Sequence, residues 1–324
     1  MSEPAPLVVI LGPTASGKSS LAIEVARRWQ GEVVCCDSTQ LYRYFDIGTS
    51  KLRGLEQRGV PHHLMDLLEP HEIFTAGDYR RRALDVLSGL RGRKRLPILT
   101  AGTGLYLRAL LEGLADAPGR SEDLRDRLRR RSKQRGSAHL HRILLRLDPP
   151  TAARIAPQDA AKLIRAIEVC LASGRRMSDV LRQPRPHLEG FQAVKIGLMP
   201  PRAALYDRIE RRIRDMLAAG WLDEVRSLLV RGFDAGAKPF QFIGYGELRA
   251  HLAGVVDLET AVRAIQQATR RYAKRQITWF RRESGVEWFE GFGDDVAIAE
   301  RAFALLARRI GPPAVGSGAA GAAL

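Results

Sequence analysis

The stretch LVVILGPTASGKS (residues 7–19) decides the fold. Its first five residues, LVVIL (7–11), form an apolar, β-branched run that is typical of a buried parallel strand. The next eight match the phosphate-binding pattern GxxxxGK[ST] at every fixed position, and SGKSSLAIEVARRW (16–29) then places apolar residues at helical spacing. A strand, a glycine-rich turn and a helix in this order are the context that a phosphate-binding loop (P-loop) requires.

Charge and cysteine content narrow the class of protein. The 324 residues include 52 Lys+Arg and 36 Asp+Glu, a formal net charge of +16. This surplus favours polyanionic partners, nucleic acid ahead of membrane, although a genome that encodes arginine freely gives the same number. Three cysteines without a CxxC spacing argue against a disulfide framework or a zinc site. With no signal-peptide pattern and no apolar run of bilayer length, we expect no membrane partner and a cytoplasmic location.

Strand and helix signals alternate along the first part of the chain. Further strands are expected at EVVCC (32–36), LPILT (96–100) and FQAVKIGLM (191–199), and a helix at AGDYRRRALDVLSGL (76–90). Such alternation predicts an α/β fold, with a P-loop doubly wound parallel sheet as its core.

A purely helical stretch interrupts this alternation. From 118 to 190 we find helical segments at 121–134, 137–147 and 159–174 and no strand signal. The sequence therefore predicts a discontinuous P-loop core domain, residues 1–117 and 191–295, and a helical insertion domain, residues 118–190. More helices are expected at 202–220, 221–231 and 257–282, and the Gly/Ala/Pro-rich tail 311–324 is expected to be disordered.

The loop chemistry points to a diphosphate or triphosphate. Glycines let the backbone wrap an anion, and the N–H groups at the helix start point at it. Lys18 adds a positive charge, and the Ser19 hydroxyl is suited to bind Mg²⁺, which usually arrives with phosphates. The expected phosphate-binding residues are Gly12, Pro13, Thr14, Ala15, Ser16, Gly17, Lys18 and Ser19.

A hydrolytic motor or switch is disfavoured. Such proteins usually carry an acidic residue at the end of a later strand for the metal. Here LPILTAG (96–102) ends without a carboxylate, and there is no NKxD guanine-reading motif. A small transferase remains.

Asp37 follows the second strand in CCDSTQLY (35–42). Ligands of parallel sheets bind at the carboxyl ends of the strands, so we expect Asp37 to face the phosphate loop. A carboxylate there suits a general base or the binding of a substrate hydroxyl. The alternative is an Asx-turn, which the following Ser38 and Thr39 favour.

A set of further motifs resembles one family. They are GPTASGKS (12–19), DSTQLY (37–42), DIGTSK (46–51), PHHLMD (61–66), GTGLY (102–106), RIERRIRDML (208–217), GYGEL (244–248) and AKRQITWFR (273–281). Together they resemble the bacterial tRNA dimethylallyltransferases, also called tRNA isopentenyltransferases, from about residue 7 to 290. Where the family has a glycine before GTGLY, this chain has Ala101.

This resemblance implies a reaction. Members of the family transfer a dimethylallyl group from dimethylallyl diphosphate to N6 of the adenosine immediately 3′ of the anticodon in tRNA. The cradled group is then a prenyl diphosphate, and the diphosphate is released. The implied partners are dimethylallyl diphosphate, Mg²⁺ and the tRNA anticodon stem-loop, and we expect a monomer.

The family's site residues map onto this sequence. The resemblance implies Asp37 as the base near N6, Thr103 as a residue that helps to hold the amine, and Lys18 as a residue that stabilises the leaving diphosphate. Arg208 and Arg212 lie four apart on one helical face, and we select Arg212 as the further diphosphate contact. The alternative for both is a solvated arginine on an amphipathic helix.

Several segments resemble tRNA contacts of the family. The implied tRNA-binding residues are Asp37, Ser38, Thr39, Gln40, Thr103, Arg125, Ala161, Lys162, Leu163, Ile164, Arg165, Gln241, Phe242, Ile243, Gly244 and Tyr245. Gln40 is suited to pair with the polar edge of adenine, whereas the apolar members are better explained by packing. Seven basic residues and no acidic one lie between Arg263 and Arg282, with Arg263, Arg270 and Lys274 in one helical stripe. Tyr272, Trp279 and Phe280 between them are more often core than stacking platforms.

Other interpretations stay open at this point. A nucleoside or small-molecule kinase would use the insertion as a lid, an RNA-binding protein would carry an inactive loop, and a related enzyme would prenylate free adenine nucleotides. His62, His63 and Asp66 have the residue types of a metal site, but adjacent histidines rarely bind one ion with good geometry.

Overall fold

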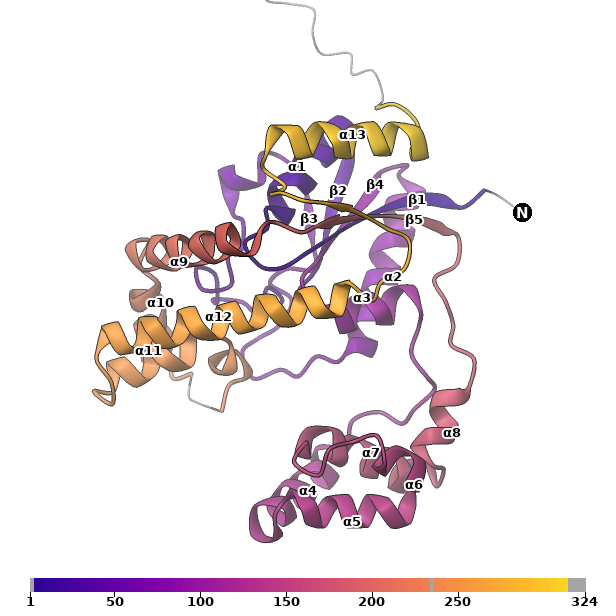
Figure 1. Ribbon diagram of the computed structural model, residues 1–324, viewed down its shortest axis with the longest axis vertical. Helices are drawn as coiled ribbons and strands as arrows, with labels where there is room; N and C mark the ends of the chain where they lie inside the picture. Colours follow the sequence, from indigo (N-terminus) through magenta and orange to yellow (C-terminus); the bar gives the residue numbers. More distant parts are fainter. Residues whose placement is uncertain (1–2, 234–235, 314–324) are drawn as a thin grey trace, which may run out of the picture. The chain divides into compact units, whose positions relative to one another are not determined.

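The computed structural model describes residues 3–233 and 236–313 (Figure 1). The chain forms two compact units, Met1–Leu110 with Glu189–Leu324, and Leu111–Leu188. The sequence analysis expected the insertion at 118–190, so the described unit starts seven residues earlier and ends two earlier. Of the tail expected to be disordered, residues 314–324 lie outside the described residues.

A parallel sheet forms the centre of the larger unit. Its strands are β1 (Ala5–Leu11), β2 (Gly31–Cys36), β3 (His62–His63), β4 (Leu96–Ala101), β5 (Phe191–Leu198) and β6 (Val286–Phe289). They are all parallel and lie in the order β3-β2-β4-β1-β5-β6. In the central register Val8 pairs with Ile98 on one side and with Val194 on the other. The predicted α/β class with a doubly wound parallel sheet is confirmed.

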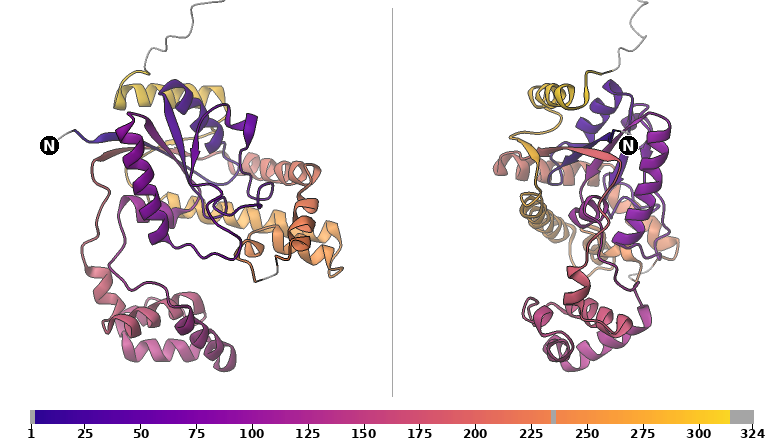
Figure 2. Two further views of the ribbon diagram at one scale, coloured as in Figure 1. Left: turned by 180° about the vertical axis from the view of Figure 1, so that it is seen from behind. Right: turned by 90° about the vertical axis from the view of Figure 1, so that its right-hand side faces the viewer.

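Helices cover both faces of this sheet (Figures 1 and 2). On one face Leu21 and Val25 of α1 (Lys18–Arg28) join Phe303 and Leu306 of α13 (Val296–Ile310) in a buried cluster with β1. Helix α2 (Ala76–Gly92) lies on the other face. Coverage on both faces explains why the central strands are almost continuous apolar runs. Because α13 is part of the core, the core continues beyond the residue 295 expected from the sequence.

The remaining helices of the larger unit position the site. They are α3 (Gly104–Leu111), α9 (Arg202–Ala218), α10 (Trp221–Val230), α11 (Tyr245–Leu252) and α12 (Leu258–Phe280), with short 3-10 turns at Gly54–Gln57 and Lys238–Gln241. Asp257 caps the N-terminus of α12, and its carboxylate accepts a hydrogen bond from the Thr260 N–H at 2.6 Å. The sequence analysis missed α3, α11, α13, β3 and β6. Among the described helices, none is both long enough and apolar enough to cross a membrane.

The smaller unit is helical throughout, as its sequence indicated. It contains α4 (Glu122–Arg135), α5 (Ser137–Leu147), α6 (Pro149–Ala152), α7 (Ala160–Ser173) and α8 (Met177–Arg182). Leu128, Leu140, Leu144, Leu163 and Ile167 form its own apolar core. This core comes from one stripe of each of α4, α5 and α7, which is how an amphipathic helix buries its apolar side.

Candidate active site

The phosphate loop lies between β1 and α1 and is closely packed from outside. A side chain at Gly12 would place Cβ 2.8 Å from the carbonyl oxygen of Leu198, at the end of β5. Gly17 has φ +85°, and a Cβ there would lie 2.6 Å from the backbone nitrogen of Gly293. The Gly293 N–H also donates to the carbonyl of Ser16 at 2.8 Å. The loop therefore needs glycine at both positions, because of close approach and, at Gly17, a left-handed backbone.

Lys18 lies inside the curve of this loop. Its ammonium group donates to the carbonyls of Pro13 at 2.7 Å and Gly12 at 3.0 Å. The pKa of Lys18 is lowered to about 8, chiefly by burial; the Asp37 carboxylate opposes this shift and the nearby Arg212 cation adds to it. The group is thus a cation at neutral pH that has lost much of its hydration, which strengthens its attraction for an anion.

Arg208 and Arg212, of which the sequence analysis selected Arg212, have different partners in the structure. Arg208 forms a two-point ion pair with Asp294, with nitrogen–oxygen distances of 2.6 and 2.8 Å. Arg212 lines the same cavity as the loop and has no carboxylate partner among the residues that the structure describes. Burial lowers the pKa of Arg212 to about 10, followed by repulsion from Arg208. An unpaired, partly desolvated guanidinium is the better anion ligand.

Asp37 stands at the carboxyl end of β2, as expected. Its Oδ1 accepts hydrogen bonds from the Thr39 N–H at 2.9 Å and the Thr39 hydroxyl at 2.7 Å, so the Asx-turn is present. Its Oδ2 accepts no hydrogen bond within the described ranges, and a side chain on Gly102 would come within 2.3 Å of it. One carboxylate oxygen therefore builds the turn, and the other remains available in the cavity.

Thr103 holds the loop that carries Asp37. The N–H groups of Gly102 and Thr103 both donate to the Cys36 carbonyl at 3.0 Å. The Thr103 hydroxyl accepts from the Ser38 N–H at 2.9 Å and donates to the Ser38 hydroxyl oxygen at 3.2 Å. Thr103 is not among the residues that line the cavity. Ala101, the departure from the family pattern, is a fully buried residue at the end of β4.

Helix α12 contributes two residues that the sequence analysis did not select. The Gln276 Oε1 accepts from the Thr14 N–H of the phosphate loop at 2.8 Å, and its Nε2 donates to the Gly102 carbonyl at 2.8 Å. The Tyr272 hydroxyl donates to the same carbonyl at 3.3 Å. Burial raises the pKa of Tyr272, and the Asp37 charge raises it further. The motif AKRQITWFR marked this segment, but nothing in its residue types showed that Gln276 spans two loops.

These elements enclose one cavity of about 1100 Å³. Its walls include Thr14 to Ser19 of the phosphate loop, Asp37 to Gln40, Arg212 on α9, and Tyr272 on α12. Gly12 and Pro13 are buried and do not line it. The cavity brings together the phosphate loop and the carboxylate that the sequence predicted to face it.

The segment 241–245 lines the cavity with its first three residues and packs against the protein interior with its last two. Gln241, Phe242 and Ile243 line the cavity. Gly244 leaves room for the Trp221 ring, which a Cβ at that position would approach to 2.0 Å. Tyr245 is fully buried, and its hydroxyl donates to Glu224 Oε1 at 2.7 Å.

The predicted contact residues of the insertion surround a buried carboxylate. Glu168 is fully buried and accepts hydrogen bonds from Arg125 at 2.8 and 2.9 Å, from Arg165 at 2.7 Å and from the Ser121 N–H at 2.8 Å. Burial alone would raise the pKa of Glu168, but these bonds outweigh it and lower the pKa to about 2. Within this unit Leu163 and Ile164 are core residues, whereas Ala161 and Lys162 are exposed.

Comparison with known proteins identifies the family. Residues 40–283 match the family model of IPP transferase. Over 306 residues the chain is 52% identical to the tRNA dimethylallyltransferase of Koribacter versatilis (strain Ellin345), a match that covers 94% of this chain and 99% of that protein. The chain belongs to the tRNA dimethylallyltransferase family. The enzyme of the same name from Solibacter usitatus (strain Ellin6076) is 48% identical over 306 residues, with the same coverage.

Solved structures of the family share the fold. The full-length tRNA isopentenylpyrophosphate transferase from Bacillus halodurans superposes with a TM-score of 0.70 at 38% identity, covering 94% of this chain and 96% of that one. A eukaryotic dimethylallyltransferase acting on tRNA has a TM-score of 0.81 at 24% identity, covering 97% and 81%, and supports the fold alone. The resemblance drawn from the sequence motifs and the enzyme class that it implied are confirmed.

Fewer basic residues of the segment 263–282 are free of carboxylate partners than the seven that the sequence contains. Arg270 pairs with Glu210, and Arg263 pairs with Glu259 at 2.7 Å. Arg271, Lys274 and Arg275 are exposed. Phe280 is fully buried, as expected for a core aromatic residue, and the Trp279 ring occupies the space that a side chain on Gly104 would need. The exposed cations suited to phosphates are therefore a subset of the seven.

Metal-binding side chains do not cluster in the described part of the chain, where no group of three or more His, Cys, Asp or Glu residues could hold an ion. His63 pairs instead with Glu32 at 2.6 Å. Ser19 lines the cavity beside the phosphate loop. Its hydroxyl oxygen fits Mg²⁺ that is held mainly by phosphate oxygens, since Mg²⁺ usually takes few protein ligands at such sites.

Proposed function

We propose that this chain transfers a dimethylallyl group from dimethylallyl diphosphate to N6 of the adenosine immediately 3′ of the anticodon in tRNA, and releases diphosphate. One observation carries the proposal: a phosphate loop and an available carboxylate oxygen line the same cavity. The family's name describes transfer of this group to tRNA. The regiochemistry, the donor and the residue roles are our inference.

The phosphate side of the cavity would stabilise the leaving group. As the bond between the allylic carbon and the diphosphate oxygen breaks, negative charge grows on that oxygen. Lys18, Arg212 and the N–H groups at the start of α1 lie around the loop, where they suit this charge. Mg²⁺ bound to the diphosphate, with Ser19 as a protein ligand, would neutralise part of the same charge.

The carboxylate side would prepare the acceptor. The exocyclic amine of adenine is a weak nucleophile because its lone pair is delocalised into the ring. In the proposed step the N6–carbon bond forms, the carbon–oxygen bond breaks, and the N6 proton passes to Asp37 Oδ2. The hydrogen bonds from Thr39 hold the Asp37 carboxylate in one orientation. A general base must be held in this way to accept a proton from a bound substrate.

An acceptor base must leave the stacked anticodon loop to enter the cavity. Extruding a base costs on the order of a few kcal/mol. The volume of about 1100 Å³ leaves room for a nucleobase beside a prenyl diphosphate. The Gln40 side chain already makes three contacts within the protein, with Cys35, Thr49 and Ser50, so its pairing with adenine would require exchanging some of them.

The test is to mix the protein with Mg²⁺, dimethylallyl diphosphate and unmodified tRNA, and to weigh the nucleosides afterwards. We expect one adenosine to gain a dimethylallyl group, with Asp37→Asn as the inactive control. Phosphoryl transfer from ATP without prenylation would support the kinase alternative instead. Equal prenylation of free adenine nucleotides would remove tRNA from the proposal. A monomer in the cytoplasm, where tRNA is found, remains our expectation.

A further inference from the structure

The segment 37–51, which we call the acceptor loop, builds one wall of the cavity without regular secondary structure. Asp37 to Gln40 and Gly48 to Ser50 line the cavity. Its backbone is left-handed at Tyr44 (φ +69°) and Ser50 (φ +55°), and so is that of Asp66 beside it (φ +53°). Such conformations are unfavourable for residues other than glycine and persist only where surrounding contacts impose them.

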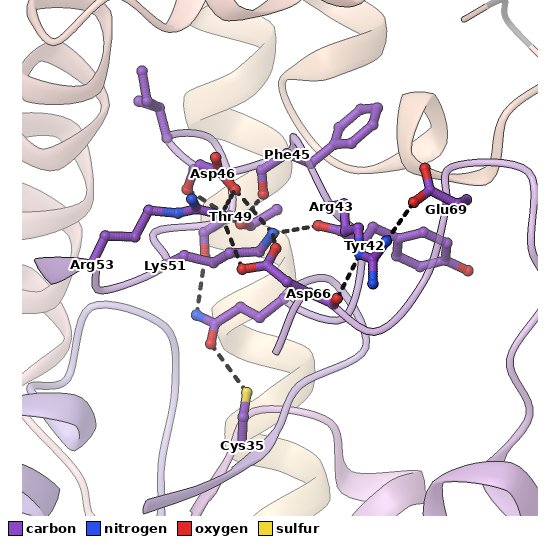
Figure 3. A network of polar contacts seen from close by, with 12 residues as sticks. Cys35, Tyr42, Arg43, Phe45, Asp46, Thr49, Lys51, Arg53, Asp66 and Glu69 are labelled. Atoms are coloured by element: carbon purple, nitrogen blue, oxygen red, sulfur yellow. Dashed lines mark hydrogen bonds and ion pairs between the residues drawn. The ribbon is translucent and has the colours of Figure 1, made fainter. Parts of the chain in front are cut away.

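A buried lysine supplies those contacts (Figure 3). Lys51 has a fully buried side chain, and its ammonium group lies 3.0 Å from Asp46 Oδ1 and 2.6 Å from Asp66 Oδ1. It also donates to the Tyr42 carbonyl. One cation is thus joined to three points along the chain, at residues 42, 46 and 66. Burying an ammonium group is costly unless it is paired in this way.

Arg53 contacts the same two carboxylates from the solvent side. Its Nη2 lies 2.7 Å from Asp46 Oδ1 and 3.0 Å from Asp66 Oδ2. The Arg53 side chain is 52% exposed, whereas that of Lys51 is 0% exposed. The chain therefore offers a matched pair of cations on one acidic site, of which only Lys51 is desolvated.

The cluster is connected to the residues that face the acceptor. The Asp66 N–H donates to the Gln40 carbonyl at 3.2 Å. The Gln40 side chain donates to the carbonyls of Thr49 at 3.1 Å and Ser50 at 3.3 Å, directly before Lys51. The main chain and the side chain of Gln40 are therefore both held by segments that Lys51 joins. Gln40 lies three residues after Asp37, so this support is close to the proposed base.

The far side of the acceptor loop is anchored separately. Glu224 Oε2 on α10 accepts from the N–H groups of Asp46 at 2.9 Å and Ile47 at 2.8 Å. Trp221 packs where a side chain on Gly48 would lie. Residues 46–48 are therefore fixed to α10, and Lys51 provides the connection from there to Tyr42 and Asp66.

We propose that Lys51 is a positioning residue for the acceptor half of the site. By pairing its buried ammonium group with Asp46 and Asp66 it imposes the conformation of the acceptor loop, and so holds Asp37 to Gln40 where the adenosine must bind. The proposal rests on the function proposed above. It gives a role to DIGTSK (46–51), a motif that the reaction itself leaves unused.

The test compares Lys51→Met with Arg53→Met as the matched control. Single-turnover prenylation at saturating tRNA and donor should fall about 10- to 100-fold for Lys51→Met, the scale of a small misplacement of reacting groups. It should change less than about fivefold for Arg53→Met, as for an exposed ion pair. Affinity for inorganic pyrophosphate, which probes the phosphate loop, should match the wild type in both. An unchanged rate for Lys51→Met, or pyrophosphate affinity that falls in parallel with the rate, would overturn the proposal.

A second variant keeps the test decisive if Lys51→Met does not fold. Lys51→Met with Asp66→Asn restores the charge balance of the buried cluster. We expect this double variant to fold and bind pyrophosphate but to remain slow, because the buried ammonium group that joins the Tyr42 carbonyl to residues 46 and 66 is still lost. If it regained the wild-type rate, Lys51 would matter only for charge balance and the proposal would be wrong.

Hydrogen exchange separates this proposal from the proposed function. Amides of residues 38–50 should exchange faster in Lys51→Met, or in the double variant, than in Arg53→Met, while those of α1 should not change. Absence of prenylation by the wild type would refute the proposed function, and the exchange result would still decide the role of Lys51. Unchanged exchange in 38–50 would overturn that role.

Discussion

At the scale of single residues, the site depends on cations that burial has partly stripped of their hydration. Lys18 and Arg212 are both cations whose pKa burial lowers, to about 8 and about 10. Arg208, one helical turn from Arg212, is instead neutralised by Asp294. The two arginines look equivalent in the sequence because the carboxylate that distinguishes them comes from a loop 86 residues away.

The lowered pKa of Lys18 predicts a pH dependence for anion binding. Below pH 8 the side chain is a cation and attracts a diphosphate, and above pH 8 it becomes neutral. We expect pyrophosphate affinity, measured by calorimetry, to fall about tenfold between pH 7 and pH 9 through this group. Pyrophosphate also changes its own charge with pH, but this affects the wild type and Lys18→Met equally and cancels in the ratio of their affinities. A ratio that does not change with pH would contradict the assignment.

Gln40 and Asp37 show what the sequence could not resolve at this scale. Both follow β2 within one motif, and the sequence predicted that they face an acceptor. Asp37 keeps one free carboxylate oxygen, whereas the Gln40 amide is used by Cys35, Thr49 and Ser50. Residue type and spacing predict which side chains approach a site, but the partners of a side-chain amide depend on the path of an irregular loop.

At the scale of elements, α12 connects the two halves of the cavity. Gln276 joins the phosphate loop at Thr14 to the loop at Gly102, against which Asp37 packs. The sequence predicted this helix within two residues at each end, since its apolar spacing is regular. It missed α11 and α13, which are shorter or near the chain end, and β3 and β6, whose two and four residues carry too little pattern.

This connection predicts that Gln276→Leu slows the reaction although Gln276 touches no reacting atom. Loss of both hydrogen bonds leaves the Thr14 N–H without its side-chain acceptor, at about 1 to 3 kcal/mol, and leaves the Gly102 carbonyl with the Tyr272 hydroxyl as its side-chain donor. We expect turnover at saturating substrates to fall at least about tenfold, in steady-state assays. The exposed Gln267→Leu on the same helix is the control, and equal rates for the two variants would contradict the connection.

The exposed cations of α12 predict a salt dependence for tRNA binding. Each phosphate contact adds about one to the slope of log affinity against log salt. Filter-binding titrations at several salt concentrations should show a slope for Lys274→Ala that is smaller by about one than that of the wild type. The control is Arg309→Ala on α13, which lies on the opposite face of the sheet from α12 and should leave the slope unchanged. Identical slopes for Lys274→Ala and the wild type would exclude that contact.

At the scale of the whole molecule, the chain forms two compact units, an α/β core and a helical insertion. The sequence predicted both, because a change from alternating strands and helices to helices alone is visible over 70 residues. The expected insertion, 118–190, lies close to the described unit Leu111–Leu188, whereas the expected core ended at 295, before α13. It could not show that Arg125 and Arg165 are used inside the insertion, where they neutralise Glu168.

The buried Glu168 predicts that the insertion is sensitive to acid. A carboxyl whose pKa is lowered by folding stabilises the fold above its unfolded value near 4.5, and this stability is lost as pH falls towards about 2. The hydrogen-exchange protection factors of α4 and α7 in the intact protein should therefore fall below pH 4.5. Glu168→Gln should lower the stability of this unit by about 3 kcal/mol at neutral pH and reduce its pH dependence. Unchanged acid sensitivity in Glu168→Gln would assign it to other groups.

The measurement that tests the account most directly is the single-turnover rate of Asp37→Asn with saturating tRNA and dimethylallyl diphosphate. If Asp37 takes the N6 proton beside a separate diphosphate cradle, the rate should fall by about 10²- to 10⁴-fold. Pyrophosphate affinity should stay close to that of the wild type, since the phosphate loop is intact. A rate near that of the wild type would contradict the account.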